Sequence, residues 1–296
     1  MADPHRGIDH LVLCTRDLTE AQKAYRSFGF TTTPPAIHPF GTGNSLVQMQ
    51  GCFLELIAVA DPAKIAPPSP GAFSFGHFIQ NFLRRREGMA MLVFESHDAV
   101  ADQAEFARKG LDTYAPFHFE RKATLPDGIS VTVGFSLAFA TSPEMPEAAF
   151  FTCQQHAPEY FWKPEYQSHP NGAVAVREVV MVADAPGRLA SFFARMHPPC
   201  AVSLDSRGLE VATGRGRVTI LTTDRFMDRF GAAATGPDSP HFAAYTIAVE
   251  DMEKLANILR RNEVPWRRRG DSIVIDADAT FGVLLEFASA TPPKRK

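Results

Sequence analysis

The sequence lacks most of the features that mark specialised protein classes. Its four cysteines show no Cys-x-x-Cys spacing, which favours buried free thiols over a disulfide framework or a zinc knuckle. The net charge is −3, so we expect neither nucleic acid nor a membrane surface as a partner. No apolar run approaches the roughly 20 residues that span a bilayer, and the first residues lack the apolar centre of a signal peptide. These absences predict a cytoplasmic protein.

Motifs for several common chemistries are also missing. There is no Gly-x-Ser-x-Gly elbow, no dinucleotide-type Gly-x-Gly-x-x-Gly after a first strand and no His-Glu-x-x-His. We therefore expect no nucleotide cofactor and no serine hydrolase. The hydrophobic fraction of 45% and the charged fraction of 21% are ordinary for a globular chain. The 24 phenylalanines are many, and they predict aromatic-rich cores and an apolar pocket.

One pattern occurs four times along the chain. Each copy has a short apolar strand, then an Asp, then a helix of about three turns. The Asp can cap the helix by accepting hydrogen bonds from the free amides of its first turn. The four predicted caps are Asp17, Asp98, Asp184 and Asp251. Apolar segments of strand length follow each helix, so each copy predicts a mixed α+β module of one strand, one helix and about three strands.

The modules group as two plus two. Residues 157–172, between the second and third modules, are rich in Pro, Tyr and polar residues, and they predict a boundary between domains 1–172 and 173–296. A second irregular stretch at 61–75 joins the first two modules and precedes a predicted short helix with a basic end at 78–86. A connection of this length is typical of a lid.

Three sets of residues carry a resemblance to a known family. Residues 7–13 (Gly-Ile-Asp-His-Leu-Val-Leu), with Asp17-Leu18 and residues 53–57 (Phe-Leu-Glu-Leu-Ile), resemble the opening module of the vicinal oxygen chelate superfamily. That superfamily includes glyoxalase I, extradiol dioxygenases and bleomycin-resistance proteins. Residues 38–44 and 169–173 resemble its glyoxalase-like branch more narrowly. The resemblance implies four βαβββ modules paired into two cup-shaped mixed sheets, with the helices outside and often a divalent metal at a cup's centre.

The resemblance places one metal ligand at His10 and another at Glu55. Imidazole and carboxylate donors suit Mn, Ni, Zn or Fe(II) and leave positions open for substrate oxygens. Both residues lie in apolar runs, where they are costly unless paired or ligated. The matching positions of the second module fall at Met91 or a neighbour and near Cys153 or Gln154, so only two of four ligands are present. The alternative is a buried hydrogen-bonded pair in a cup that binds an organic ligand without metal.

Several further polar residues are candidates for the site. His156 and His169 lie near the expected rim, where either can complete the ligand set, and we predict a catalytic role for His169 beside Glu55. The turn at residues 41–44 (Gly-Thr-Gly-Asn) can expose amides to an anionic or carbonyl group, although a plain hairpin turn fits it equally well. The predicted substrate-binding residues are His38, Thr42, Asn44 and His156.

The second pair of modules matches the ligand pattern less well. In the third module, Arg177 or Glu178 stands at the position that matches His10, and Thr219 or a neighbour stands at the position that matches Glu55. In the fourth module, only Glu286 matches a ligand position. We predict an Arg177–Glu286 ion pair in a structural second half, with an anion site at Arg177 as the alternative. This argues against extradiol dioxygenase activity, because those enzymes take their iron ligands from the second half.

Two functional hypotheses follow. The first is a divalent-metal-dependent lyase or isomerase that acts on a small oxygen-rich substrate and stabilises an enolate-like intermediate. The second is a metal-free binding protein of the resistance or sequestration type, whose aromatic cup traps a small molecule. Both predict that the main cavity lies in the first half, lined by His10 and Glu55. The sequence leaves the oligomeric state open, with a homodimer as one option.

Overall fold

A computed structural model describes residues 6–124, 130–197 and 201–291. The strands up to residue 155 are β1 (Ile8–Cys14), β2 (Ala36–Ile37), β3 (Thr42–Met49), β4 (Cys52–Val59), β5 (Gly88–Glu95), β6 (Asp112–Thr113), β7 (Phe117–Thr124), β8 (Ser130–Thr141) and β9 (Ala149–Gln155). The later strands are β10 (Ala173–Val182), β11 (Val202–Asp205), β12 (Gly208–Ala212), β13 (Arg217–Leu221), β14 (His241–Val249), β15 (Arg267–Arg269), β16 (Ser272–Ile275) and β17 (Leu284–Ser289). The α-helices are α1 (Leu18–Ser27), α2 (Phe75–Arg85), α3 (Ala99–Arg108), α4 (Pro158–Phe161), α5 (Ala190–Met196), α6 (Thr223–Phe230) and α7 (Met252–Arg261).

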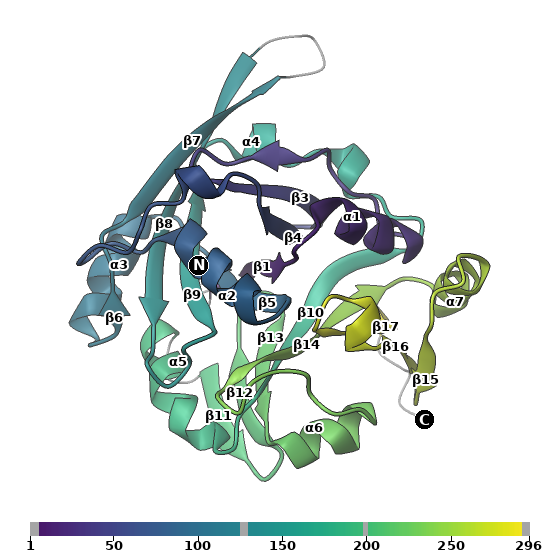
Figure 1. Ribbon diagram of the computed structural model, residues 1–296. Helices are drawn as coiled ribbons and strands as arrows, with labels where there is room; N and C mark the ends of the chain where they lie inside the picture. The colour runs from purple at the N-terminus through teal and green to yellow at the C-terminus, as the bar shows by residue number, and fades with distance from the viewer. Residues whose placement is uncertain (1–5, 125–129, 198–200, 292–296) are drawn as a thin grey trace.

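The strands form two mixed sheets that repeat one topology (Figure 1). The first sheet has the order β2-β3-β4-β1-β5-β9-β8-β6, with β7 paired to β8, and the second has the order β11-β12-β13-β10-β14-β17-β16-β15. In both, the first strand of a module runs parallel to its own last strand and antiparallel to the first strand of the partner module. The predicted α+β architecture of paired βαβββ modules is confirmed. The second module adds a long β7–β8 hairpin, which projects from the molecule in Figure 1.

Three of the four module helices begin as the sequence predicts. The side chains that accept hydrogen bonds from first-turn amides are those of Asp17, Asp98 and Asp251. The prediction for Asp184 is wrong, because a 3-10 helix at Pro186–Leu189 precedes α5 and the N-cap of α5 makes no side-chain hydrogen bond. One of the two amides that an Asp at position 184 would need belongs to Pro186, which has no N–H.

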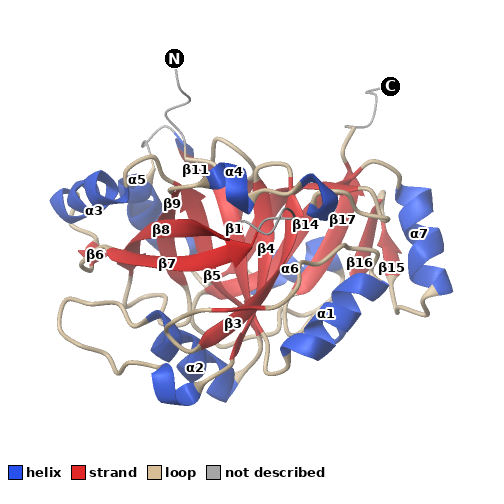
Figure 2. Cartoon of the chain, turned by 90° about the horizontal axis from the view of Figure 1, so that it is seen from above, coloured by secondary structure: helices blue, strands red, loops and turns tan. Residues whose placement is uncertain are grey.

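The module helices α1, α3, α5 and α7 pack on the sheet faces that lie opposite the cups. One continuous core there includes Tyr25, Phe106, Phe193 and Leu259 together with residues of both sheets. Figure 2 shows α3 and α5 at one end of the molecule and α7 at the other, outside the strands. The chain enters the second sheet at Ala173. The division into two domains at residue 172 stays a prediction, since this core joins both sheets.

The other face of each sheet has its own apolar cluster and its own covering helix. We call the face that carries Val12, Phe53 and Phe151 the first cup, and α2 packs against it. The face that carries Val180 and Leu284 is the second cup, and α6 packs against it. The predicted helix at 78–86 is therefore real and begins three residues earlier. Helix α6 is not among the predicted helices, although its buried Phe226 and Phe230 have the four-residue spacing of one helix face.

Candidate functional site

The floor of the first cup brings His10 of β1 together with Glu55 of β4. Val12 pairs with Glu55 in the parallel register, and alternate residues of a strand share one face, so His10 and Glu55 point to the same side. Both residues are buried, with 4% and 6% of their surfaces exposed. The distance from His10 Nε2 to Glu55 Oε2 is 3.8 Å.

His10 is oriented by the residue before it. Its Nδ1 lies 2.6 Å from Asp9 Oδ2, and Gln155 Nε2 donates to the other oxygen of Asp9 at 3.0 Å. Because a carboxylate can only accept, Nδ1 donates to Asp9, and Nε2 is the ring nitrogen on the side of Glu55. The ring stacks on Phe53 with 4.3 Å between centroids, which restricts its rotation.

Two predicted substrate-binding residues, Asn44 and His38, lie beside the other oxygen of Glu55, and a third, Thr42, contacts His38. Asn44 Nδ2 donates to Glu55 Oε1 at 2.6 Å and lies 3.2 Å from His38 Nε2. His38 Nδ1 is 2.8 Å from Thr42 Oγ1. Burial lowers the pKa of His38, with the charge of Glu55 opposing the shift, so the imidazole accepts from Asn44 and donates to Thr42. Thr42 is fully buried and acts through His38.

A small apolar cavity of about 50 Å³ lies above this polar floor. The phenyl rings that line it belong to Phe40, Phe53, Phe75, Phe119, Phe135, Phe151 and Phe161. Cys153 and Arg121 also reach the cavity. Burial, followed by the charges of Asp9 and Glu55, raises the pKa of the Cys153 thiol well above its usual range, so the thiol is neutral. Among the described residues, Cys14, Cys52 and Cys153 are buried free thiols as predicted, and Cys200 lies outside the described part of the chain.

The structure does not bring His156 or His169 into the first cup. His156 is exposed, and its Nε2 lies 2.8 Å from Ser136 Oγ. His169 is buried elsewhere, where Nδ1 accepts from the Thr31 amide at 3.0 Å and Nε2 donates to the carbonyl of Gln48 at 2.7 Å. Both ring nitrogens of His169 are therefore occupied by the backbone, and the idea that either histidine completes a ligand set has no geometric support.

Register identifies the positions in the second module that match His10 and Glu55. Met91 stands seven residues before its helix cap Asp98, as His10 does before Asp17. Val93, two residues later, pairs with Phe151. The matching residues are thus Met91 and Phe151, and the expectation of Cys153 or Gln154 is corrected by two to three residues. Within the described ranges, no group of three or more His, Cys, Asp or Glu side chains is arranged to hold a metal ion.

Comparison with known families agrees with this architecture. The sequence model of the family described as a glyoxalase-like domain matches residues 8–197, which span the first two modules and the start of the third. The chain belongs to the glyoxalase-like domain family. Through that family it is a member of the vicinal oxygen chelate superfamily. No curated protein matches the sequence. No helix in the described ranges is long and apolar enough to cross a membrane.

Solved structures share the fold of this glyoxalase-like protein at low identity. A hypothetical protein from Staphylococcus aureus has a TM-score of 0.64 at 12% identity, covering 96% of this chain and 99% of that one. A mutant of 4-hydroxymandelate synthase from Streptomyces coelicolor has a TM-score of 0.61 at 11% identity, covering 98% and 95%. A fusion of a xylose isomerase-like TIM barrel with 4-hydroxyphenylpyruvate dioxygenase has a TM-score of 0.56 at 10% identity, and this chain, matched in full, spans 51% of it. At these identities the likeness concerns the fold alone.

The second cup of this glyoxalase-like protein carries an ion-pair network at the matching positions. Arg229 of α6 donates to Glu178 at 2.7 and 2.9 Å and to Glu286 at 3.1 Å. The predicted Arg177–Glu286 pair is wrong, since Arg177 donates to the carbonyl of Ser289 at 3.1 Å. Arg177 lies where the register of β10 against β14 shifts, and its guanidinium contacts the end of β17. The second cup therefore holds its carboxylates with a guanidinium.

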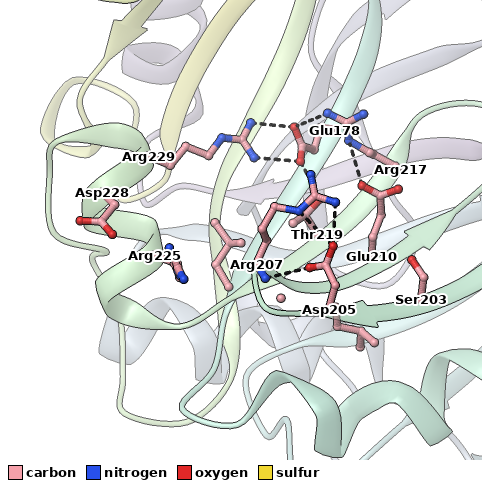
Figure 3. A pocket seen from close by; sticks show the side chains of 13 residues that line it. Glu178, Ser203, Asp205, Arg207, Glu210, Arg217, Thr219, Arg225, Asp228 and Arg229 are labelled. Carbon is pink, nitrogen blue, oxygen red and sulfur yellow. Dashed lines mark hydrogen bonds and ion pairs between the residues drawn. The ribbon is translucent and has the colours of Figure 1, made fainter.

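The larger polar cavity lies in this second half, so the predicted position of the main cavity is wrong. It has a volume of about 410 Å³ and opens beside β11, β12 and α6 (Figure 3). Glu178 at its base is 2% exposed. Burial opposes ionisation of Glu178, but the hydrogen bonds and charge of Arg229, with help from Arg217 and Thr219, lower its pKa to about 2. The walls are likewise paired, with Arg207 bound to Asp205 at 2.7 Å. By volume, the second cavity is the better candidate for the functional site. By chemistry it is the first cup, because no Lys or Arg among the described residues forms an ion pair with its buried carboxylate.

Proposed function

We propose that the first cup is the active site of a glyoxalase-like enzyme, in which His10 and Glu55 hold a divalent metal and act on a small oxygen-rich substrate. One observation carries this proposal: Nε2 of a buried imidazole lies 3.8 Å from a buried carboxylate, and a second carboxylate accepts a hydrogen bond from Nδ1 of the same ring. A carboxylate that hydrogen-bonds the outer nitrogen of a ligating histidine is the usual support of a protein metal site.

The donor chemistry fits a cation. Among the described residues, Asn44 makes the only hydrogen bond to the Glu55 carboxylate, and no Lys or Arg side chain forms an ion pair with it. A buried carboxylate in this situation gains from a nearby cation. One nitrogen and one oxygen donor suit Mn, Ni, Zn or Fe(II) and leave several coordination positions for water and substrate. When bound, such a metal would polarise a substrate carbonyl and favour an enolate.

The surrounding residues supply the remaining functions of a lyase or isomerase site. Glu55 is the residue that accepts a proton from the carbon next to the substrate carbonyl. Asn44 fixes one oxygen of that carboxylate, and His38 with Thr42 fixes Asn44. The phenyl rings exclude bulk water, which strengthens each electrostatic contact in the cup. These roles give His38 and Asn44 positioning functions at the site.

A metal-free binding protein is the second candidate. It is favoured by Met91 and Phe151, which put apolar side chains where a partner module would supply donors. A cup lined by seven phenyl rings then traps a small apolar molecule, and His10–Glu55 serves as a buried polar pair. The two candidates differ in whether the wild-type protein takes up metal.

Elemental analysis decides between them. Wild-type protein is incubated with Mn, Ni, Zn or Fe(II), desalted and analysed beside His10→Ala and Glu55→Gln. The control is Glu286→Gln, which changes the matching carboxylate of the second cup. We expect occupancy near one metal per chain in the wild type and the control and a sharp loss in the two site variants, because each removes one of the protein donors. Wild-type occupancy below about a tenth of a metal per chain, with excess metal supplied, would establish the metal-free alternative.

A further inference from the structure

One arginine projects into the first cup from the long hairpin. On β7, Phe117, Phe119 and Arg121 alternate along the strand and so share a face. Phe119 and Arg121 both line the cavity, and the Phe119 ring meets the His38 ring edge-on at 5.6 Å between centroids. The guanidinium of Arg121 thus belongs to the same cavity as the His10–Glu55 floor.

Arg121 has no hydrogen-bond or ion-pair partner in this cavity among the residues that the structure describes. Within the described residues, no hydrogen bond or ion pair joins its guanidinium to another group, whereas Arg229 in the second cup binds two carboxylates. Arg121 is half-buried, and burial lowers its pKa while the charge of Glu55 opposes that shift. A guanidinium that has lost part of its water and gained no partner is unfavourable on its own. It becomes favourable when a ligand supplies an anion.

We propose that Arg121 binds the carboxylate of a small monocarboxylic acid, which names the substrate class of the site proposed above and rests on that proposal. The planar fork of arginine matches a carboxylate through two parallel hydrogen bonds. The negative charge of Glu55 in the same cavity disfavours a dianion such as a phosphate ester, because one guanidinium cannot balance both. A carboxylate on Arg121 directs the rest of the ligand toward His10 and Glu55.

The size of the cavity sets the size of the acid. At about 50 Å³ it has room for about four water-sized positions. That space suits an oxo- or hydroxy-acid of about two to four carbons when the phenyl rings stay in place. The carbonyl or hydroxyl oxygen of such an acid is the group left to meet the polar floor. Pyruvate and L-lactate are therefore suitable probes, and pyruvamide and lactamide are neutral probes of the same shape.

Calorimetric titration of the metal-free full-length protein with these four probes tests the proposal. We expect wild type to bind at least one acid at least about tenfold more tightly than its amide, the range of a charge-assisted hydrogen bond. Arg121→Met should remove that preference, and Arg121→Lys should restore part of it. The control is Arg225→Met, which removes an exposed arginine from the wall of the second cavity and should leave the preference unchanged.

Three results would overturn the assignment: equal binding of acid and amide by wild type, no binding of either, or full preference retained by Arg121→Met. Circular dichroism and the midpoint of thermal unfolding establish that the variants are folded. Uptake of Mn²⁺ in the absence of the acid probes is measured on the same variants, because Arg121→Met should not change it. If wild type takes up Mn²⁺ but does not prefer the acid to its amide, this inference is rejected and the proposed metal site stands. If wild type prefers the acid but takes up no Mn²⁺, only the metal site is rejected.

Discussion

At the scale of single residues, Asp9 controls what His10 presents to the cup. The Asp9 carboxylate accepts from Nδ1 of His10, so Nε2 is the ring nitrogen that stays on the side of Glu55. We predict that Asp9→Asn lowers the affinity for Mn²⁺ or Zn²⁺ about 10- to 100-fold, the usual cost of losing the outer partner of a ligating histidine. Calorimetric titration with each metal measures this. The control is Glu178→Gln, a buried carboxylate of the second cup, and equal affinities in Asp9→Asn and wild type would contradict the orienting role.

Glu178 supplies a prediction about acid stability. Its pKa of about 2 in the folded protein lies below the value of about 4.3 for a free glutamate. A depressed pKa contributes stability that is fully present above the unfolded value and is lost as the pH falls toward the folded one. We therefore expect Glu178→Gln to lower the free energy of unfolding by about 1–3 kcal/mol at pH 6, and the difference from wild type to shrink between pH 4.5 and pH 2.5. Urea unfolding across this range measures it. Exposed Glu210, changed to Gln, should show neither effect.

The sequence predicted part of the first cup because the decisive residues lie on regular strands. His10 and Glu55 fall on one face through parallel register, and β3, which begins at Thr42 within the segment predicted as a turn, places Asn44 beside them. Arg121 is not among the predicted site residues, although its alternation with Phe117 and Phe119 along one strand places it on the same face as these rings. His169 was misplaced since it lies in an irregular segment, where spacing says nothing about direction.

At the scale of elements, the four module helices form an internal comparison of capping. Asp17, Asp98 and Asp251 accept hydrogen bonds from first-turn amides, and Asp184 does not. We predict that Ala at each of the first three positions lowers the free energy of unfolding by about 1 kcal/mol, the usual value of such a cap. Asp184→Ala should change it by less than half of that. Urea unfolding of the four variants measures this, and a full cap effect at position 184 would contradict the 3-10 start of the third helix.

Local sequence patterns predict where helices end, but they do not predict the role of α6. Capping and glycine stops are local, so the ends of α1 and α3 follow from the sequence, and Gly29 and Gly110 have the positive φ values of 86° and 74° that end them. The role of α6 is not local. It matters because Arg229 reaches Glu178 and Glu286, which lie far apart in the sequence and meet only when the second sheet forms.

At the scale of the whole molecule, one topology supports two different cups. The position of His10 is taken by Glu178 in the third module, where Val180 pairs with Thr219 as Val12 pairs with Glu55. In the second cup Arg229 pairs with both carboxylates and Arg217 pairs with Glu178, whereas in the described part of the first cup no Arg or Lys pairs with Glu55 and no carboxylate pairs with Arg121. The same fold thus gives a cavity whose buried carboxylates are paired with arginines in one half and a cavity whose charged groups lack such ion pairs among the described residues in the other.

The two halves are held together by a core that contains a buried pair of hydroxyl groups. Tyr25 of α1 and Tyr245 of β14 lie 2.7 Å apart between their oxygens, and each is at most 1% exposed. Burial raises the pKa of both phenols, so both stay neutral and one donates to the other. This bond joins the first module to the fourth. Its disruption should be felt by both halves.

A double-mutant cycle across this pair is our last prediction. Tyr25→Phe or Tyr245→Phe alone leaves one buried hydroxyl without its partner and should lower the free energy of unfolding by about 1–3 kcal/mol. The double variant should be less destabilised than the sum of the two, because no hydroxyl is then left unpaired. Trp162 and Trp266 report separately on the two halves, so urea unfolding is followed in Trp162→Phe and Trp266→Phe backgrounds. Coincident transitions in both backgrounds indicate one cooperative unit. Additive effects of the two tyrosine changes, or separate transitions for the two tryptophans, would show that the shared core does not couple the sheets.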